Sequence, residues 1–277
     1  MSGQLKEFFS RELAREDDQI NLANANLLFS EYLTGPFDSA HYLSLLDELA
    51  DSIWHSVSAS TTASEAVGRL NQYLFEELKF SGNTNNYYEA DNSFLNKVLD
   101  LRTGIPISLS LLYLELGWRL GLPVWGVGLP GHFIVGCDTP TTPIYIDVFN
   151  QGHLLSQDEC LDLAQMPTTN RVEFRKQFLK PVSRKAILYR MLLNLKHLYV
   201  RAENWQAAYA TVDLMLIVAP DQATDVRDRG LIAYRLNRRQ EAIFDIQRYL
   251  FLAPHIQDAS WLKKRLEQME EELLRLN

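Results

Sequence analysis

The sequence has few cysteines, no long apolar run and no excess of positive charge. Its two cysteines are too few for the disulfide framework of a small secreted protein. No apolar run approaches the ~18 residues of a membrane-spanning helix, and the start of the chain lacks the basic and apolar segments of a secretory signal. Lysine and arginine number 27 against 35 aspartate and glutamate, and the resulting net charge of −8 repels a nucleic-acid backbone. We therefore expect a cytoplasmic protein that binds neither membranes nor nucleic acid.

What the sequence does contain is the composition of an ordinary globular protein. Of its 277 residues, 47% are hydrophobic and 22% are charged. Such a composition is typical of a chain that buries a core. At ~150 residues per domain, the length allows about two domains.

Residues 1–90 are predicted to form a helical N-terminal region. Apolar residues recur at spacings of three and four, for example at Leu22, Ala25 and Leu28, as on the buried face of a helix. Gly35-Pro36 separates two of these helices, and the segment 81–86, rich in Ser, Gly and Asn, favours turns.

Residues 91–183 are predicted to form a core of mixed structure. An almost wholly apolar stretch begins at Pro106, which suits the first turn of a helix, and ends at Gly121, so we expect a buried helix there. The period then changes, and the segments 124–129, 132–137 and 144–149 have the residue types of short strands. Three strands this close in sequence favour an antiparallel meander.

Residues 184–277 contain an internal repeat. Ala219-Pro220 recurs 34 residues later as Ala253-Pro254, and a period of 34 is that of the tetratricopeptide repeat. We expect two helical repeats followed by a capping helix over 260–276. At least three repeats are normally needed for a stable independent domain, so these two are expected to pack against the domain before them.

Two charged positions of the repeats stand out. Lys196 occupies a position where the repeat favours a small residue, so the first copy is degenerate. Arg229 belongs to the segment Arg227-Asp228-Arg229-Gly230. That segment is expected to form a salt bridge that locks the repeats against the middle domain, or alternatively to present a guanidinium to an anionic ligand.

The sharpest polar pair is His132 with Asp147. Six residues separate the second and third predicted strands, so paired positions add up to an odd number, as 132 and 147 do, and both side chains lie on one face. An aspartate that accepts from one imidazole nitrogen leaves the other nitrogen free as a base. The alternative is a histidine at the rim of the sheet with a structural role only.

Several segments of the chain resemble one protein family. They are Asn92-Ser93-Phe94-Leu95, Gly104-Ile105-Pro106-Ile107-Ser108-Leu109, the segment 126–133 and the segment 227–230. With them the chain, from about residue 15 to 270, resembles the bacterial Sir-B type family of transglutaminase-like proteins with C-terminal tetratricopeptide repeats. The resemblance implies a fold in which a cysteine at a helix start, a strand histidine and an aspartate of the next strand form a papain-type triad. His132 and Asp147 match the last two.

The cysteine of that triad is absent. The usual helix length of the family places it near Pro106, and no cysteine precedes position 137. Cys137 lies on the histidine strand and Cys160 in a later helix, so neither sits at a helix start where amide dipoles would activate a thiol. Ser108 is the nearest hydroxyl, and it acts only if a base removes its proton. The structural alternative is a buried serine bonded to a carbonyl one turn earlier.

No metal or cofactor site is expected. The other histidines show no metal-ligand spacing with one another or with the cysteines. These histidines are His41, His55, His153, His197 and His255. The glycines of the segment 126–131 lie in a strand and turn and open no helix, unlike those of a dinucleotide site.

Together these observations predict an α+β protein, mainly α, with a helical N-terminal region, a transglutaminase-like core with a small antiparallel sheet, and C-terminal helical repeats. The missing cysteine beside intact repeats predicts a non-catalytic or remodelled module, a pseudoenzyme. It would act as a protein-interaction scaffold that binds a protein or peptide partner through the repeats. No thiol-dependent transglutaminase or protease activity is expected.

The alternative function is that of a hydrolase or acyl transferase. Ser108 would be the nucleophile, His132 the base and Asp147 the group that orients the base. This alternative requires the Ser108 hydroxyl to lie within about 3.5 Å of an imidazole nitrogen.

Overall fold

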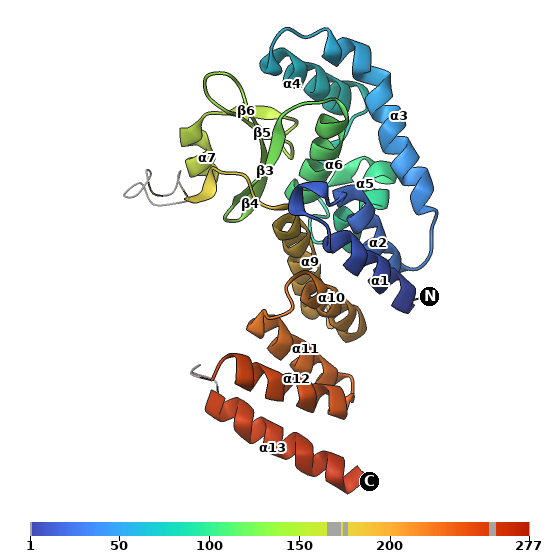
Figure 1. Cartoon of the computed structure of the whole chain (residues 1–277), viewed down its shortest axis with the longest axis vertical. Helices are drawn as coiled ribbons and strands as arrows, with labels where there is room; N and C mark the ends of the chain where they lie inside the picture. Colours follow the sequence, from blue (N-terminus) through green and yellow to red (C-terminus); the bar gives the residue numbers. More distant parts are fainter. Residues whose placement is uncertain (1, 165–172, 174–176, 255–258, 277) are drawn as a thin grey trace. The chain divides into compact units, whose positions relative to one another are not determined.

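The computed structural model describes residues 2–164, 173, 177–254 and 259–276 (Figure 1). The chain divides into two compact units, Met1–Met191 and Leu192–Asn277. We call the second of these the repeat unit.

Helices and one small sheet make up the first unit. Its helices are α1 (Ser2–Leu13), α2 (Leu22–Thr34), α3 (Ser39–Ser58), α4 (Ala63–Asn71), α5 (Leu95–Leu101), α6 (Pro106–Arg119) and α7 (Gln157–Leu163). A π-helical segment, Gln72–Glu77, extends α4, and short 3-10 turns lie at Asp17–Gln19 and Ala90–Ser93. The predicted N-terminal helices are therefore confirmed. Side chains of Asn21, Asp38 and Thr62 accept backbone hydrogen bonds at the starts of α2, α3 and α4, as N-cap residues do.

The buried helix predicted to begin at Pro106 is α6, and its residues are buried from Pro106 to Gly117. Its one buried carboxylate has defined partners. Glu115 accepts a hydrogen bond from the backbone N–H of Ala23, at the start of α2, at 2.9 Å and pairs with Arg119 one turn later. The carboxylate is therefore satisfied both by a cation and by a helix N-terminus.

The predicted meander is confirmed and is one strand longer than expected. Strands β3 (Val124–Leu129), β4 (His132–Cys137), β5 (Ile144–Asp147) and β6 (His153–Leu155) form a four-stranded sheet in that order, with every pair antiparallel (Figure 1). The chain turns directly after Asp147, so the third strand is shorter than predicted. Strand β6 has three residues, too few to show a period in sequence. Strands β1 (Ser81–Gly82) and β2 (Thr103–Gly104) form a separate parallel pair, and β1 lies in the segment 81–86 for which the sequence predicted turns.

The repeat unit consists of the later part of α9 (Arg184–Arg201) with α10 (Trp205–Val218), α11 (Ala223–Arg235), α12 (Arg239–Leu252) and α13 (Ala259–Leu276). The 34-residue period is visible in the backbone. Ala219 and Ala253 end α10 and α12 with φ of −136° and −135°. Ala208 and Ala242 are both fully buried. Two helical repeats and a following helix are therefore present, as predicted.

Arg229 does not have the predicted role. Its guanidinium binds Asp245 through two hydrogen bonds, at 2.7 and 2.8 Å, and Asp213 through a third at 2.8 Å. All three residues belong to the repeat unit, so the expected bridge to the middle domain is wrong. The arginine joins α10, α11 and α12 instead. Sequence spacing could not show this, because either carboxylate lies sixteen residues from the arginine.

Lys196 also has partners within the repeat unit. Its ammonium lies 3.0 Å from a carboxylate oxygen of Asp225 and 2.9 Å from one of Asp228. Burial lowers the pKa of Lys196, but its hydrogen bonds and ion pairs with the two aspartates outweigh this effect and raise the pKa. A buried lysine thus replaces the expected small residue because α11 supplies two counter-charges.

We predict that Arg229→Ala lowers the free energy of unfolding by about 2 to 4 kcal/mol, because it leaves the buried carboxylate of Asp245 without its cation. Chemical denaturation followed by circular dichroism measures the change. Arg238→Ala is the matched control, since its pair with Glu241 is half exposed and should contribute less than ~1 kcal/mol. Equal losses in the two variants would contradict a special role for Arg229.

Candidate functional site

His132 and Asp147 form the contact that the sequence predicted. Nε2 of His132 lies 2.9 Å from Oδ1 of Asp147. Because an ionised carboxylate only accepts, Nε2 carries the hydrogen of this contact. The aspartate is 2% exposed and the histidine 12%, so the pair is almost withdrawn from solvent.

The strand register places both side chains on the same face. β4 pairs with β5 through Val135 and Ile146, which places position 134 opposite Asp147 and makes His132 a diagonal neighbour. Diagonal side chains in a sheet are within reach of each other when one of them is long. The parity argument from the hairpin loop is therefore confirmed, while the catalytic use of the pair stays a prediction.

Asp147 also builds the turn that follows β5. Its carboxylate accepts from the side-chain amide of Asn150 at 2.7 Å and from the Asn150 backbone N–H at 3.3 Å. Burial raises the pKa of Asp147, but the hydrogen bonds from His132 and Asn150 and the charge of His132 outweigh this effect, so the pKa lies below its usual value. One carboxylate thus orients the imidazole and stabilises the β5–β6 connection.

Aromatic rings extend from the imidazole towards the surface. The Phe149 ring meets His132 edge-on with centroids 6.2 Å apart, Tyr87 meets Phe149 at 6.1 Å, and Tyr88 meets Tyr87 at 5.3 Å. Tyr88 is 71% exposed. From the other side, Arg190 donates to the backbone carbonyl of His132 at 2.7 Å. These neighbours hold the histidine in one orientation.

Ser108 is not brought to the imidazole. Its hydroxyl lies 2.5 Å from the carbonyl oxygen of Asn92 and 3.1 Å from that of Ile105, and it accepts from the backbone N–H of Ile105 at 3.0 Å. It is 1% exposed. The hydroxyl therefore closes the first turn of α6 and ties it to the segment before α5, and within the described residues no hydrogen bond joins it to His132.

The strand register associates the His–Asp pair and the body of α6 with different faces of the sheet. The face that carries His132 and Asp147 also carries Ile134, which packs in one cluster with residues of α7. Helix α6 packs against the opposite face, where a Cβ at Gly117 would lie 2.5 Å from a methyl group of Val124. The body of α6 thus packs on the face of the sheet opposite to that of His132 and Asp147.

Neither cysteine supplies a nucleophile. Cys137 and Cys160 are free and fully buried. Burial, with a smaller contribution from Asp138, raises the pKa of Cys137 to about 11, and burial with Glu159 raises that of Cys160 to about 12. Both thiols are therefore protonated at neutral pH, and a protonated thiol is a poor nucleophile.

The described residues suggest no metal centre. Among them, no three His, Cys, Asp or Glu side chains gather as the ligands of an ion, and His255 lies outside the described residues. In the same part of the chain, no helix combines the length and the apolar character needed to cross a bilayer.

Asn150, Phe149 and Arg190 are among the residues of the site that the sequence analysis did not identify. Asn150 had a readable signal, because an asparagine three residues after an aspartate and before a glycine is typical of a turn. Phe149 was assigned to a strand, although it lies beyond the end of β5. Arg190 gave no signal, since 58 residues separate it from the carbonyl to which it donates.

Comparison with known proteins gives matches along most of the chain. A family model described as the transglutaminase-like superfamily matches residues 40–193, and a tetratricopeptide repeat model matches residues 195–267. A "UPF0162 protein" of Xylella fastidiosa is 31% identical over 260 residues, covering 93% of this chain and 92% of that protein. A protein of the same name from Vibrio cholerae is 32% identical over 197 residues, covering 71% of this chain and 73% of that protein.

A longer protein contains a similar segment. The "F-box only protein 21" of Homo sapiens is 34% identical over 206 residues, which are 70% of this chain and 32% of that protein. No solved structure matches this chain.

We predict that Asp147→Ala lowers the free energy of unfolding by about 1 to 3 kcal/mol, because it leaves the imidazole and the Asn150 amide without their acceptor. Denaturation midpoints measure the effect. Asp51→Ala, on an exposed position of α3, is the control and should stay within ~0.5 kcal/mol of the parent chain. An unchanged midpoint in Asp147→Ala would show that water replaces the contact without cost.

The Asp147 carboxylate should also make the free energy of unfolding depend on pH in the acid range. Because its folded pKa is lowered, Asp147 stabilises the fold above its unfolded pKa of ~3.9, and this contribution is lost as pH falls through the folded pKa. The difference in unfolding free energy between the parent chain and Asp147→Asn should therefore shrink from pH 6 to pH 3. A difference that is constant over that range would contradict the pairing.

Both thiols should resist modification in the folded protein. Ellman's reagent is expected to react with neither cysteine under native conditions and with both after denaturation in guanidinium, because each thiol is buried and protonated. When the protein is incubated with an amine donor and a glutamine-containing acceptor, we expect no transamidation that is sensitive to a thiol alkylator. Rapid labelling of either cysteine in the native state would overturn this assignment.

Proposed function

Since the chain belongs to the transglutaminase-like superfamily and continues into tetratricopeptide repeats, we propose that it is a protein-interaction scaffold built on a remodelled, non-catalytic transglutaminase-like core. The core would supply a rigid body, and the repeats would bind a protein or peptide partner. Grooves of helical repeats are well suited to extended peptides and to partner helices.

One observation carries the proposal. At the start of α6, where the resemblance places the catalytic cysteine, the chain has Pro106, and the nearest hydroxyl, that of Ser108, is fully used in hydrogen bonds to Asn92 and Ile105. A histidine oriented by an aspartate has no catalytic effect on an acyl group unless a nucleophile or a water molecule lies within its reach. The His132–Asp147 pair is retained here as a structural contact.

The relatives support a modular role. In the human F-box only protein 21 the similar segment accounts for about a third of the chain, so this kind of core also occurs inside a longer protein. The bacterial relatives named UPF0162 extend over nearly the same length as this chain.

The first test concerns catalysis. We expect the purified full-length chain and His132→Ala to give the same background rates in transamidation and in hydrolysis of a panel of activated esters. A rate that falls in His132→Ala would contradict the proposal. Labelling of Ser108 by a fluorophosphonate, mapped by mass spectrometry, would instead favour the Ser–His–Asp alternative.

The second test concerns binding. Chemical cross-linking in the cells of origin, followed by reconstitution from purified components, identifies a partner that binds reversibly. We expect His132→Ala to bind this partner as tightly as the parent chain does, and the mass of the partner to be unchanged after incubation. A cleaved, deamidated or covalently attached partner would show that the core is an enzyme.

A further inference from the structure

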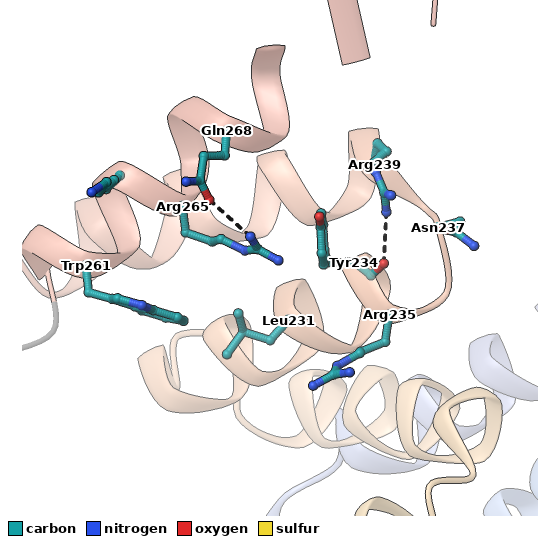
Figure 2. A pocket seen from close by; sticks show the side chains of 9 residues that line it. Leu231, Tyr234, Arg235, Asn237, Arg239, Trp261, Arg265 and Gln268 are labelled. Atoms are coloured by element: carbon teal, nitrogen blue, oxygen red, sulfur yellow. Dashed lines mark hydrogen bonds between the residues drawn. The ribbon is translucent and has the colours of Figure 1, made fainter. Parts of the chain in front are cut away.

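The repeat unit contains a groove between α11 and the first half of α13. Its cavity volume is about 750 Å³. Figure 2 shows side chains of both helices lining it, together with Asn237 of the α11–α12 connection and Arg239 at the start of α12. They are Leu231, Tyr234, Arg235, Asn237, Arg239, Trp261, Lys264, Arg265 and Gln268. The lining thus has four cations and no carboxylate, in a chain whose net charge is −8.

Three of these cations can be compared with the paired cations of the repeat unit. Arg235, Lys264 and Arg265 form no ion pair with a carboxylate among the described residues. Several cations of the same unit are neutralised away from the groove, as in the pair of Arg229 with Asp245 and that of Arg248 with Asp221, whereas exposed Lys263 has no such pair among the described residues. The three groove cations are available to an anion because no carboxylate of the described residues pairs with them.

The aromatic ring of Tyr234 preorganises the groove. The guanidinium of Arg239 lies 4.2 Å from the ring centroid, and that of Arg265 lies 4.4 Å from it. The Tyr234 hydroxyl lies 3.0 Å from a carboxylate oxygen of Glu272. Arg265 also donates to Gln268 at 3.0 Å (Figure 2). Stacked guanidinium groups lose less side-chain entropy when they bind a carboxylate.

Apolar surface accompanies the charge. Trp261 is 58% exposed at one end of the groove. A second cavity of about 310 Å³ between α9 and α11 shares Leu231 and Arg235 with the first. It adds the apolar side chains of Val200, Trp205 and Ile232, together with His197 and the ion pair of Lys196 with Asp228. The two cavities therefore follow one another along α11, and an extended chain of several residues fits them better than a single small anion does.

We propose that this groove binds an acidic peptide segment that carries at least one aromatic or large aliphatic side chain. Carboxylates of the segment pair with Arg235, Lys264 and Arg265, and its apolar side chain packs on Trp261 and Leu231. This inference rests on the proposed scaffold function and names the chemistry of its partner. Opposite charge and an apolar anchor are the features by which short peptides are recognised in grooves.

The test is a selection from a random dodecapeptide library on the immobilised full-length chain. Enriched peptides should be rich in Asp and Glu and contain an aromatic residue or leucine. Fluorescence anisotropy of the most enriched peptide then gives its affinity. Each single change, Arg235→Gln or Lys264→Gln, should weaken binding about two- to fivefold, and the double charge reversal Arg235→Glu with Lys264→Glu at least ~10-fold.

Lys263→Glu is the matched control, because Lys263 is exposed on the same helix next to Lys264 but does not line the groove. It should leave the affinity within about twofold. Circular dichroism and the melting temperature check that each variant is folded. Raising the salt concentration from 50 to 300 mM should weaken binding of the acidic peptide, because the cations are partly exposed.

Three outcomes would overturn the inference. The first is enrichment of neutral or basic peptides, or an equal loss of affinity in Lys263→Glu and in the double reversal. Either result would show that the groove does not select acidic peptides. A single-stranded oligonucleotide with the same charge as the peptide serves as a competitor. If it displaces the labelled peptide as strongly as unlabelled peptide does, the groove is a general polyanion site. Failure to enrich any peptide would reject the peptide groove, whereas a partner found by cross-linking would still support the scaffold.

Discussion

The start of α6 is buried, and its unpaired backbone groups must find partners there without water. Ser108 meets this demand: its hydroxyl accepts from the N–H at the helix start and donates to the carbonyl of Asn92. The Asn92 side chain in turn binds the carbonyls of Asn86 and Tyr87, and the Tyr87 ring packs on Phe149 beside His132. One hydroxyl thus connects the central helix, the loop before it and the surroundings of the histidine.

The same hydrogen bonds define how the Ser108 hydroxyl is used. A serine can attack only if its proton goes to a base, and this serine uses its proton to hold two segments of backbone together. The His132–Asp147 pair has the geometry that orients an imidazole, yet its carboxylate also forms the turn with Asn150. The contacts of Ser108 and Asp147 thus connect separate backbone segments around the histidine.

Charge is used in two ways in the repeat unit. Lys196 and Arg229 are partly or largely buried, and each has two aspartate partners, because a buried charge without a counter-charge is costly. Arg235, Lys264 and Arg265 line a groove in which solvent or a ligand supplies the counter-charge. A cation that lacks a carboxylate partner is informative only after the paired cations of the same unit have been identified.

The sequence by itself determined the helices, the meander, the 34-residue repeat and the pairing of His132 with Asp147. Each of these depends on local periodicity or on the parity of a short hairpin loop, which neighbouring residues encode. Tertiary structure decided the rest: that Ser108 is turned towards Asn92, that Arg229 binds Asp213 and Asp245, and that the cations of α11 and α13 share one groove. These contacts join residues sixteen or more positions apart, and no local pattern specifies which distant partner a polar side chain meets once packing has closed around it.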